Sequence, residues 1–306
     1  MKNITKSLLY LAVLSFWLLF PSCEKEPENY GNGERKGDEI GSDVFFKYGR
    51  RGDELKFNDF ELYDSSTCIF YLKEEFDEFS EPLKGPKGTF CFLNNGHIIY
   101  SGTFFPAYAS YIPSGPFIMT SPNFYGNSGF RMEIWINDGP DVRNCPEIIE
   151  VLNEHGLLHS GLAGRVDSIV AKGNQLTFGF TIINHDVTDL LIIDLNKTGP
   201  GLFHYFTNGL YLRDQDHNNV FSSTIPSQKP EPWNSWTPDW LTLLQSGDSA
   251  SYVIDYPMEN QIAPGEYNLL FEFPGLHFQV SKDQLFQGEA RIWIGDITLR
   301  GKITIP

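Results

Sequence analysis

Three tryptophans lie within eight residues of one another and are the clearest candidates for a binding surface. Trp233, Trp236 and Trp240 belong to the proline-containing segment EPWNSWTPDWL, which lies between strand-like runs. Indole rings on a rigid loop can stack on the flat apolar face of a sugar ring. Spacings of three and four would also place all three rings on one side of a short helix packed against the core. The sequence favours core packing for these rings, and glycan binding is the functional alternative, for which this segment is the best candidate surface.

A second group of polar residues has part of the spacing of a calcium loop. Asp214, Asp216 and Asn218 follow the D-x-D-x-N order that begins many such loops. Asn219 stands where the loop needs glycine at its sixth position, and Ile225 stands where it needs glutamate at its twelfth. We therefore expect a solvated turn, with no metal site and no cofactor.

The familiar catalytic motifs are absent from the sequence, which has no G-x-S-x-G elbow, no H-E-x-x-H and no Walker loop. His185 and His204 lie on or beside strand-like runs, where we expect structural roles. We predict no catalytic residue and no enzyme activity. A glycan hydrolase stays open as an alternative, because its two carboxylates can be far apart in sequence.

The N-terminus has the pattern of a signal peptide. Lys2 and Lys6 precede an uncharged apolar run, Ser7 to Phe20, which is shorter than the roughly 20 residues that a membrane span needs. The run ends at FPSC, and this resembles the lipoprotein box of bacterial lipoproteins. The resemblance implies that residues 1–22 are removed and that Cys23 carries acyl and diacylglycerol chains. The alternative is a plain signal peptide with Cys23 as a free thiol.

The residues after Cys23 suggest where the protein is anchored. Glu24, Lys25 and Glu26 resemble the acidic export stretch of surface lipoproteins of the Bacteroidota, which implies an outer-membrane protein that faces the cell exterior. The alternative is a merely solvated tether. Residues 23–43 are rich in glycine and polar side chains, so we expect a flexible acidic tether with a reach of about 25 Å.

The charge of the chain limits its partners. The formal net charge is −16, and removal of residues 1–22 with their two lysines would make it −18. Such a chain has no general attraction for nucleic acid or for anionic lipid. We therefore expect no nucleic-acid partner, and contact with the bilayer only through the acyl anchor.

Composition and turn signals predict a mostly β protein. Aromatic residues make up 15% of the chain, and strands favour aromatic side chains. We predict a β-rich N-terminal domain over residues 44–160, since short strand-like runs alternate there with turns. Its clearest signal is LNNGHI, where Asn-Gly suits a hairpin turn. One short helix is expected near the domain junction, in NCPEIIEVLNEHG, because proline suits a helix start and glycine a helix end.

The pattern of strand-like runs in residues 161–306 predicts a second domain. About seven strand-like runs follow one another there, among them LFHYFTNGLYLRD, with the spacing of an antiparallel β-sandwich. In APGEYNLLFEF, Tyr267 follows a Pro-Gly turn at the start of a strand. This resembles the tyrosine corner of immunoglobulin-like domains, which implies an Ig-like sandwich and a structural hydroxyl on Tyr267.

The cysteines leave the redox state open. Besides Cys23 the chain has Cys68, Cys91 and Cys145. Cys68 and Cys91 could form a disulfide in an oxidising compartment, and buried free thiols are equally compatible with the sequence.

These observations favour a non-catalytic binding or accessory module on the cell surface, with a glycan as its candidate ligand. The alternative is a structural or adhesive component that binds a protein at the cell surface.

Overall fold

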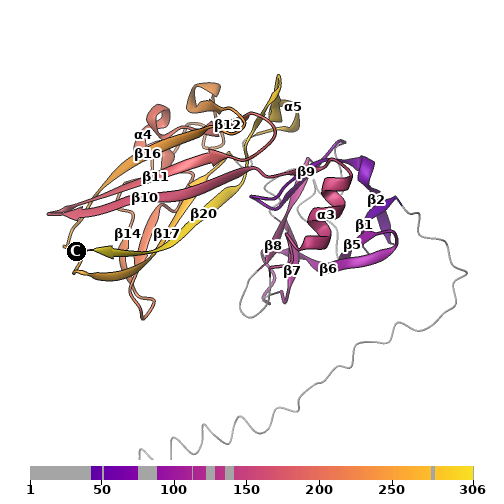
Figure 1. Cartoon of the computed structure of the whole chain (residues 1–306), viewed down its shortest axis with the longest axis horizontal. Helices are drawn as coiled ribbons and strands as arrows, with labels where there is room; N and C mark the ends of the chain where they lie inside the picture. Colours follow the sequence, from indigo (N-terminus) through magenta and orange to yellow (C-terminus); the bar gives the residue numbers. More distant parts are fainter. Residues whose placement is uncertain are drawn as a thin grey trace, which may run out of the picture. The chain divides into compact units, whose positions relative to one another are not determined.

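The computed structural model describes the chain over seven ranges: 43–49, 52–74, 88–111, 113–121, 128–134, 141–276 and 280–305. All of them lie in one compact unit, Gly41–Pro306. The predicted division at residue 160 falls inside this unit and stays a prediction. The described chain is mostly β, as the sequence predicts (Figure 1).

The first part of the chain forms a nine-stranded sheet in the order β2-β1-β5-β6-β7-β8-β4-β3-β9. Neighbouring strands are antiparallel except for β6 with β7 and β3 with β9. The strands are β1 (Val44–Tyr48), β2 (Asp53–Lys56), β3 (Phe60–Asp64), β4 (Ile69–Leu72), β5 (Thr89–Asn94), β6 (His97–Pro106), β7 (Pro116–Ser121), β8 (Gly129–Ile134) and β9 (Leu158–His159). A 3₁₀ turn, η1 (Phe57–Asp59), connects β2 to β3.

This sheet curls around a core of aromatic side chains. Phe70 of β4 and Phe92 of β5 stack with ring centroids 4.9 Å apart, although four strand pairings separate β4 from β5 in the sheet order. The helix α3 (Pro146–Glu154) lies against the first sheet (Figure 1). It contributes buried Ile148, Val151 and Leu152 to the same core. Pro146 occupies its first position, so the predicted helix is confirmed.

The turn chemistry of the first sheet also follows the sequence. Asn95 and Gly96 connect β5 to β6 with φ angles of 49° and 77°. A two-residue hairpin turn of type I′ needs positive φ at both of its central residues, and Asn-Gly adopts this at little cost. The predicted hairpin is therefore present.

Two further sheets form a sandwich of Ig-like topology. One has the order β10-β11-β16 and the other the order β14-β13-β17-β20, and all pairs within them are antiparallel. The strands are β10 (Leu162–Lys172), β11 (Gln175–Asn184), β13 (Leu210–Arg213), β14 (Asn219–Ser222), β16 (Ser249–Pro257), β17 (Gly265–Pro274) and β20 (Asp296–Ile305). Figure 1 shows the long strands of both sheets running side by side.

Aromatic side chains join the two sheets. Phe180 of β11 lies 4.7 Å from Phe271 of β17 and 6.2 Å from Phe273, measured between ring centroids. Tyr267 has its hydroxyl 2.7 Å from the carbonyl oxygen of Ala263, to which it donates. This is the bond of a tyrosine corner, and it confirms the structural role expected for Tyr267.

A fourth sheet and two short helices accompany the sandwich. The sheet has the order β15-β12-β19-β18, in which β12 and β19 are parallel. Its strands are β12 (Leu190–Ile193), β15 (Leu241–Leu244), β18 (Phe286–Gln287) and β19 (Ala290–Ile292). The helices are α4 (Leu195–Phe203) and α5 (Lys282–Leu285), and a 3₁₀ turn, η2 (Pro238–Trp240), precedes β15.

The helices α4 and α5 are present in addition to the predicted helix, and the sequence did not indicate them. Asp194 caps α4 by accepting a hydrogen bond from the backbone of Asn196. Within α4, Gly199 adopts a φ of 70° and kinks the helix before Pro200. Glycine and proline have low helix propensity. For this reason the sequence does not indicate a helix here.

Candidate functional site: an arginine-lined cavity

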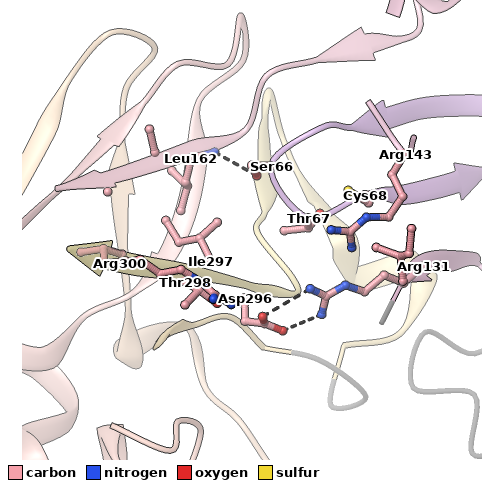
Figure 2. Close-up of a pocket in the computed structure, with 14 residues that line it drawn as sticks. Ser66, Thr67, Cys68, Arg131, Arg143, Leu162, Asp296, Ile297, Thr298 and Arg300 are labelled. Atoms are coloured by element: carbon pink, nitrogen blue, oxygen red, sulfur yellow. Dashed lines mark hydrogen bonds and ion pairs between the residues drawn. The ribbon is translucent and has the colours of Figure 1, made fainter. Parts of the chain in front are cut away.

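A cavity of about 930 Å³ lies where the first sheet meets the sandwich (Figure 2). Its walls include Ser66–Cys68 before β4, Arg131 of β8, Arg143, the start of β10 and the first half of β20. The volume is at the upper end of the range of small-ligand sites, about 300–1,000 Å³. The cavity therefore has room for a ligand as large as a disaccharide.

Arg131 and Asp296 form a two-pronged ion pair in the wall. Nη1 of Arg131 lies 2.6 Å from Oδ1 of Asp296, and Nη2 lies 3.3 Å from Oδ2. Each side chain is 17% exposed, so both can be reached from the cavity. The fork of an arginine matches a carboxylate in this geometry, which fixes the plane of the guanidinium group.

Arg143 is held from its other side by Asp141. Nε and Nη2 of Arg143 donate to the two oxygens of Asp141 at 2.9 and 2.7 Å, and Nη1 donates to the carbonyl oxygen of Met132 at 3.3 Å. A guanidinium group has five N–H donors, so these bonds use three of them. Figure 2 shows Arg143 and Arg131 both directed into the cavity. The two side chains thus form a fixed pair of cationic donors.

Thr67 adds an unsatisfied hydroxyl to the same wall. It is 1% exposed, and its Oγ1 has no hydrogen-bond partner. Gly295 packs against it with a φ of 100°, and a Cβ there would lie 2.7 Å from Cγ2 of Thr67. A buried hydroxyl without a partner costs about 1–3 kcal/mol, so a polar ligand that reached it would recover stability.

The charge of the cavity differs from that of the chain. Its lining holds three arginines, including exposed Arg300, and one acid, Asp296, whereas the whole chain carries −16. Burial raises the pKa of nearby Glu133, and Asp296 raises it further, while Arg131 and Arg143 lower it. Glu133 Oε1 lies 3.4 Å from Nε of Arg131, so this carboxylate also contacts the arginine of the wall.

The cavity has no activated nucleophile among its described residues. Burial raises the pKa of the Cys68 thiol, although Arg143 and Arg131 lower it. The reactive species of cysteine is the thiolate, which a raised pKa disfavours. The hydroxyl of Ser66 donates to a carboxylate oxygen of Asp64 at 2.6 Å instead of to a histidine. The arrangement is suited to binding a polar ligand.

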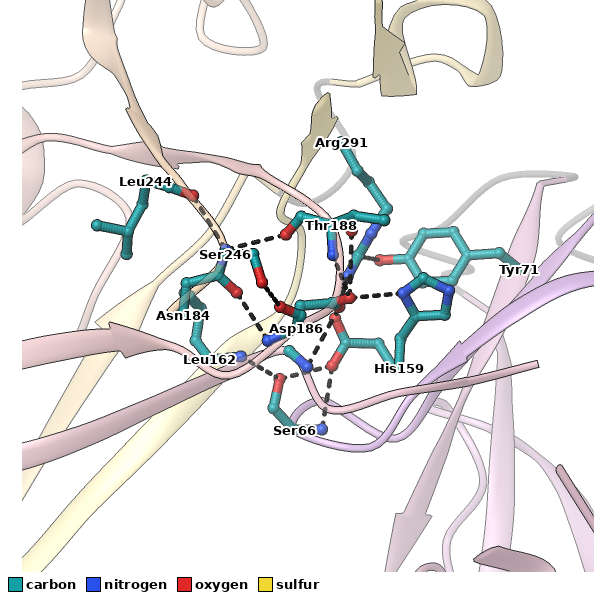
Figure 3. Close-up of polar contacts among 12 residues, drawn as sticks. Ser66, Tyr71, His159, Leu162, Asn184, Asp186, Thr188, Leu244, Ser246 and Arg291 are labelled. Carbon is teal, nitrogen blue, oxygen red and sulfur yellow. Dashed lines mark hydrogen bonds and ion pairs between the residues drawn. The ribbon is translucent and has the colours of Figure 1, made fainter. Parts of the chain in front are cut away.

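A buried polar network supports one side of the cavity (Figure 3). Arg291 of β19 donates through Nη2 to Asp64 at 2.8 Å and to Asp186 at 3.1 Å. Its Nη1 donates to the hydroxyl of Tyr71 at 3.1 Å, and the guanidinium carbon lies 5.2 Å from the centre of that ring. All three charged side chains are at most 1% exposed.

Asp186 is the most connected member of this network. Burial alone would raise its pKa, but the hydrogen bond with His159 and the charge of Arg291 hold the pKa well below its ordinary value. Oδ1 of Asp186 lies 2.6 Å from Nδ1 of His159. The backbone N–H of Gly161 also donates to Asp186, at 3.3 Å. The network therefore connects buried side chains of opposite charge, although Nε of Arg291 has no hydrogen-bond partner.

Ser66 connects the network to the cavity. It lines the cavity, donates to Asp64, and accepts a hydrogen bond from the backbone N–H of Leu162 at 3.2 Å. The turn that carries Thr67 and Cys68 is thereby fixed against the first residue of β10.

The three predicted tryptophans differ in exposure. Trp233 is 48% exposed, whereas Trp236 and Trp240 are half-buried, and Trp236 packs against the sandwich core. They lie on an extended segment, with only Trp240 inside the short turn η2, so the three rings do not share one face of an α-helix.

Two neighbouring aromatic residues extend this region. Phe206 lies 6.2 Å from Trp240 and 5.1 Å from Tyr205, measured between ring centroids. The hydroxyl of Tyr205 donates to the carbonyl oxygen of Trp233 at 3.0 Å. We refer to these two residues and the three tryptophans as the aromatic surface.

The predicted turn at Asp214 is stabilised by hydrogen bonds to the carboxylate of Asp214. Asp214 accepts hydrogen bonds from the backbone N–H groups of Asp216 and Asn218 at 2.9 and 2.8 Å, and from the side-chain amide of Asn218 at 3.0 Å. These bonds occupy both carboxylate oxygens from within the loop. No group of three potential metal ligands occurs in the described part of the chain.

His204 and His185 have different environments. His204 is buried, with Nδ1 2.7 Å from the carbonyl oxygen of Pro200 and Nε2 3.1 Å from the hydroxyl of Tyr256. Burial lowers its pKa, although the bond to Pro200 raises it. His185 is exposed, and its backbone pairs with Gly161.

The three described cysteines are free thiols. Cys68 is buried, and Cys91 and Cys145 are half-buried. The structure therefore shows the free-thiol alternative for Cys68 and Cys91.

The N-terminal predictions lie outside the described residues. These are the signal peptide, Cys23, and the export residues Glu24, Lys25 and Glu26. No helix in the described ranges has both the length and the apolarity that crossing a membrane requires.

The cavity itself was not predicted from the sequence. Arg131 lies in a run that reads as an ordinary strand, and Arg143 lies just before the predicted helix. Asp296, the partner of Arg131, is 165 positions away. The only local signal is a pair of arginines in an acidic chain, and this does not indicate a shared site.

Comparison with protein-family models gives no match, and comparison with curated proteins finds no similar sequence.

Proposed function

We propose that this chain is a lipid-anchored, non-catalytic binding module at the outer surface of an outer membrane, and that the aromatic surface binds a glycan. The ring of Trp233 carries the proposal, because it is 48% exposed. Its carbonyl oxygen accepts a hydrogen bond from Tyr205, whose ring contacts Phe206. A partly exposed aromatic surface favours the apolar face of a sugar ring. The half-buried Trp236 and Trp240 hold the segment against the sandwich.

A fluorescence titration tests the glycan contact. Residues 41–306 are titrated with a panel of neutral polysaccharides while tryptophan emission is followed. We expect a saturable change with at least one polysaccharide and its loss in Trp233→Ala. Phe286→Ala is the matched control, because Phe286 is an aromatic residue of similar exposure, 42% against 48%. A saturable change that Trp233→Ala leaves intact would contradict the proposal.

The anchor is tested separately. Metabolic labelling with an acyl-chain analogue should mark the full chain and should not mark Cys23→Ser. Protease treatment of intact cells should remove the protein if it faces the exterior. The label tests the lipoprotein-box resemblance, and the protease tests the orientation that Glu24, Lys25 and Glu26 imply.

A protein-binding or adhesive role is the second candidate. The strand β16 is the last strand in the order β10-β11-β16, and its Val253 is 65% exposed. A long edge strand with exposed apolar residues can receive a strand from a partner. If this role holds, Val253→Lys should reduce adhesion of cells that display the protein, while the glycan titration should not change.

A further inference from the structure

We infer that the arginine-lined cavity is a second binding site, which takes an acidic saccharide with the carboxylate of a uronate residue against Arg143 and Arg131. This inference does not depend on the aromatic surface, because none of the residues of that surface lines the cavity. It rests on the charge, the available donors and the size of the cavity.

The position of the arginines selects a carboxylate. Arg143 and Arg131 are 18% and 17% exposed, so each presents only part of its guanidinium group. The carboxylate of Asp141 fixes Arg143 from behind, and Asp296 fixes Arg131. Arginine donors fixed in advance lose little entropy when a planar carboxylate binds. Three of the side chains that line the cavity are cationic and one is acidic, which favours an anionic ligand over a neutral one.

The remaining lining fits a hydroxyl-rich ring. Asp296 can accept from sugar hydroxyls, and exposed Thr298 can donate or accept. Thr67 supplies the hydroxyl that has no partner. Apolar Leu162 and Ile297 lie in the same wall and suit the C–H face of a sugar. A lone carboxylic acid would use the arginines and leave these groups without contacts.

The size of the cavity agrees with a short oligosaccharide. About 930 Å³ exceeds the needs of a single small anion and lies at the upper end of the range for small-ligand sites. We therefore choose digalacturonate as the probe. The neutral disaccharide of the same linkage, galactobiose, tests the need for the carboxylate, and acetate tests the need for the ring.

Calorimetric titration of the purified chain provides the test. We expect saturable binding of digalacturonate, with galactobiose and acetate at least tenfold weaker. In Arg143→Met, the affinity for digalacturonate should fall at least tenfold. Arg213→Met is the charge-matched control, because Arg213 is exposed on β13, donates through Nε to Asn219, and does not line the cavity. It should bind digalacturonate as the unchanged protein does.

A second variant keeps the test valid if Arg143→Met does not fold. Thr67→Val removes only the hydroxyl that lacks a partner, so its stability should be unchanged or higher. Its affinity for digalacturonate should nevertheless fall about fivefold, which a purely structural role for Thr67 would not produce. Galactobiose binding as tightly as digalacturonate would overturn the inference. So would folded Arg143→Met and Thr67→Val proteins that both bind within twofold of the unchanged chain.

A third result would also overturn the inference. If the peptide trialanine binds more tightly than digalacturonate, the site serves the carboxylate of a protein chain end instead of a saccharide. The glycan titration of Trp233→Ala uses neutral polysaccharides and a different site, so either proposal can fail while the other stands.

Discussion

Nη2 of Arg291 and Oδ2 of Asp64 form an ion pair 2.8 Å apart, although the two residues are separated by 227 positions in the sequence. Asp64 ends β3 of the first sheet, and Arg291 belongs to β19 beside the sandwich. Neither side chain is more than 1% exposed. The pair joins the two regions through buried charge, in addition to the apolar contacts of Leu62, Ile69 and Tyr71 with the sandwich core.

Replacement of Arg291 should be strongly destabilising. Arg291→Met removes the cation that Asp64 and Asp186 share, although Asp186 keeps its contact with His159. Breaking a buried pair of this kind costs about 3–5 kcal/mol. Urea denaturation measures the change in the free energy of unfolding. Arg165→Met is the control, because the Arg165 side chain is 65% exposed in its pair with Asp167, and exposed pairs contribute less than about 1 kcal/mol. Equal effects of the two substitutions would refute the structural role of Arg291.

Acid should weaken the fold through Asp186. Its pKa is lower in the folded state than in the unfolded state. Its contribution is therefore complete above its ordinary pKa of about 4 and is lost as the pH falls through the folded value. The free energy of unfolding, measured from pH 7 to pH 2.5, should drop below about pH 4. Asp186→Asn should be less stable at pH 7 and should show a smaller drop.

A matched variant separates this effect from general acid unfolding. Asp216 is exposed and does not belong to the network. Asp216→Asn should reproduce the pH profile of the unchanged chain. A profile in Asp186→Asn with the same acid slope as the unchanged chain would show that another group causes the drop.

The tyrosine corner should have a modest, measurable effect. Tyr267→Phe removes only the hydroxyl that donates to Ala263 at 2.7 Å, so the free energy of unfolding should fall by about 1 kcal/mol. Tyr108→Phe is the control, because Tyr108 is 66% exposed. A Tyr267→Phe protein as stable as the control would argue against the corner.

Thiol labelling should distinguish the cysteines. Unfolded residues 41–306 should accept three maleimide groups without prior reduction, because Cys68, Cys91 and Cys145 are free. In the folded protein Cys68 should react most slowly, since it is buried and burial raises its pKa. Peptide mass mapping gives the rate at each site. A single label in the unfolded, unreduced protein would reveal a disulfide.

Local signals predict the parts of the fold that depend on local chemistry. Asn95 and Gly96 form the hairpin turn, and Pro146 begins α3, because turn angles and helix starts are decided by a few neighbouring residues. Tyr267 could be assigned for the same reason: its hydroxyl reaches a carbonyl only four residues away.

The helix α4 shows where such signals fail. The run Leu202 to Asp214 is rich in aromatic residues and predicts one strand, yet α4 extends to Phe203 and β13 begins only at Leu210. The cap at Asp194 and the packing of Phe203 in the sandwich core decide the structure here. Tertiary packing overrides strand propensity at this position.

No local sequence pattern predicts the cavity or the buried polar network. Arg131 meets Asp296 only because β8 of the first sheet and β20 of the sandwich come together. Neither residue type nor spacing indicates this meeting, since the partners are decided by the packing of separate sheets.

The ion pair between Asp64 and Arg291 also affects how the chain folds during its synthesis. Synthesis runs from the N-terminus, so β3 is complete long before β19 exists. Until then Asp64 has no cation to accompany it into the interior, and the first sheet cannot close around it without burying an unpaired charge. A chain cut short before residue 291 should therefore keep this end of the sheet open to proteases. The stability of the first sheet therefore depends on Arg291, a residue that is synthesised much later than the sheet itself.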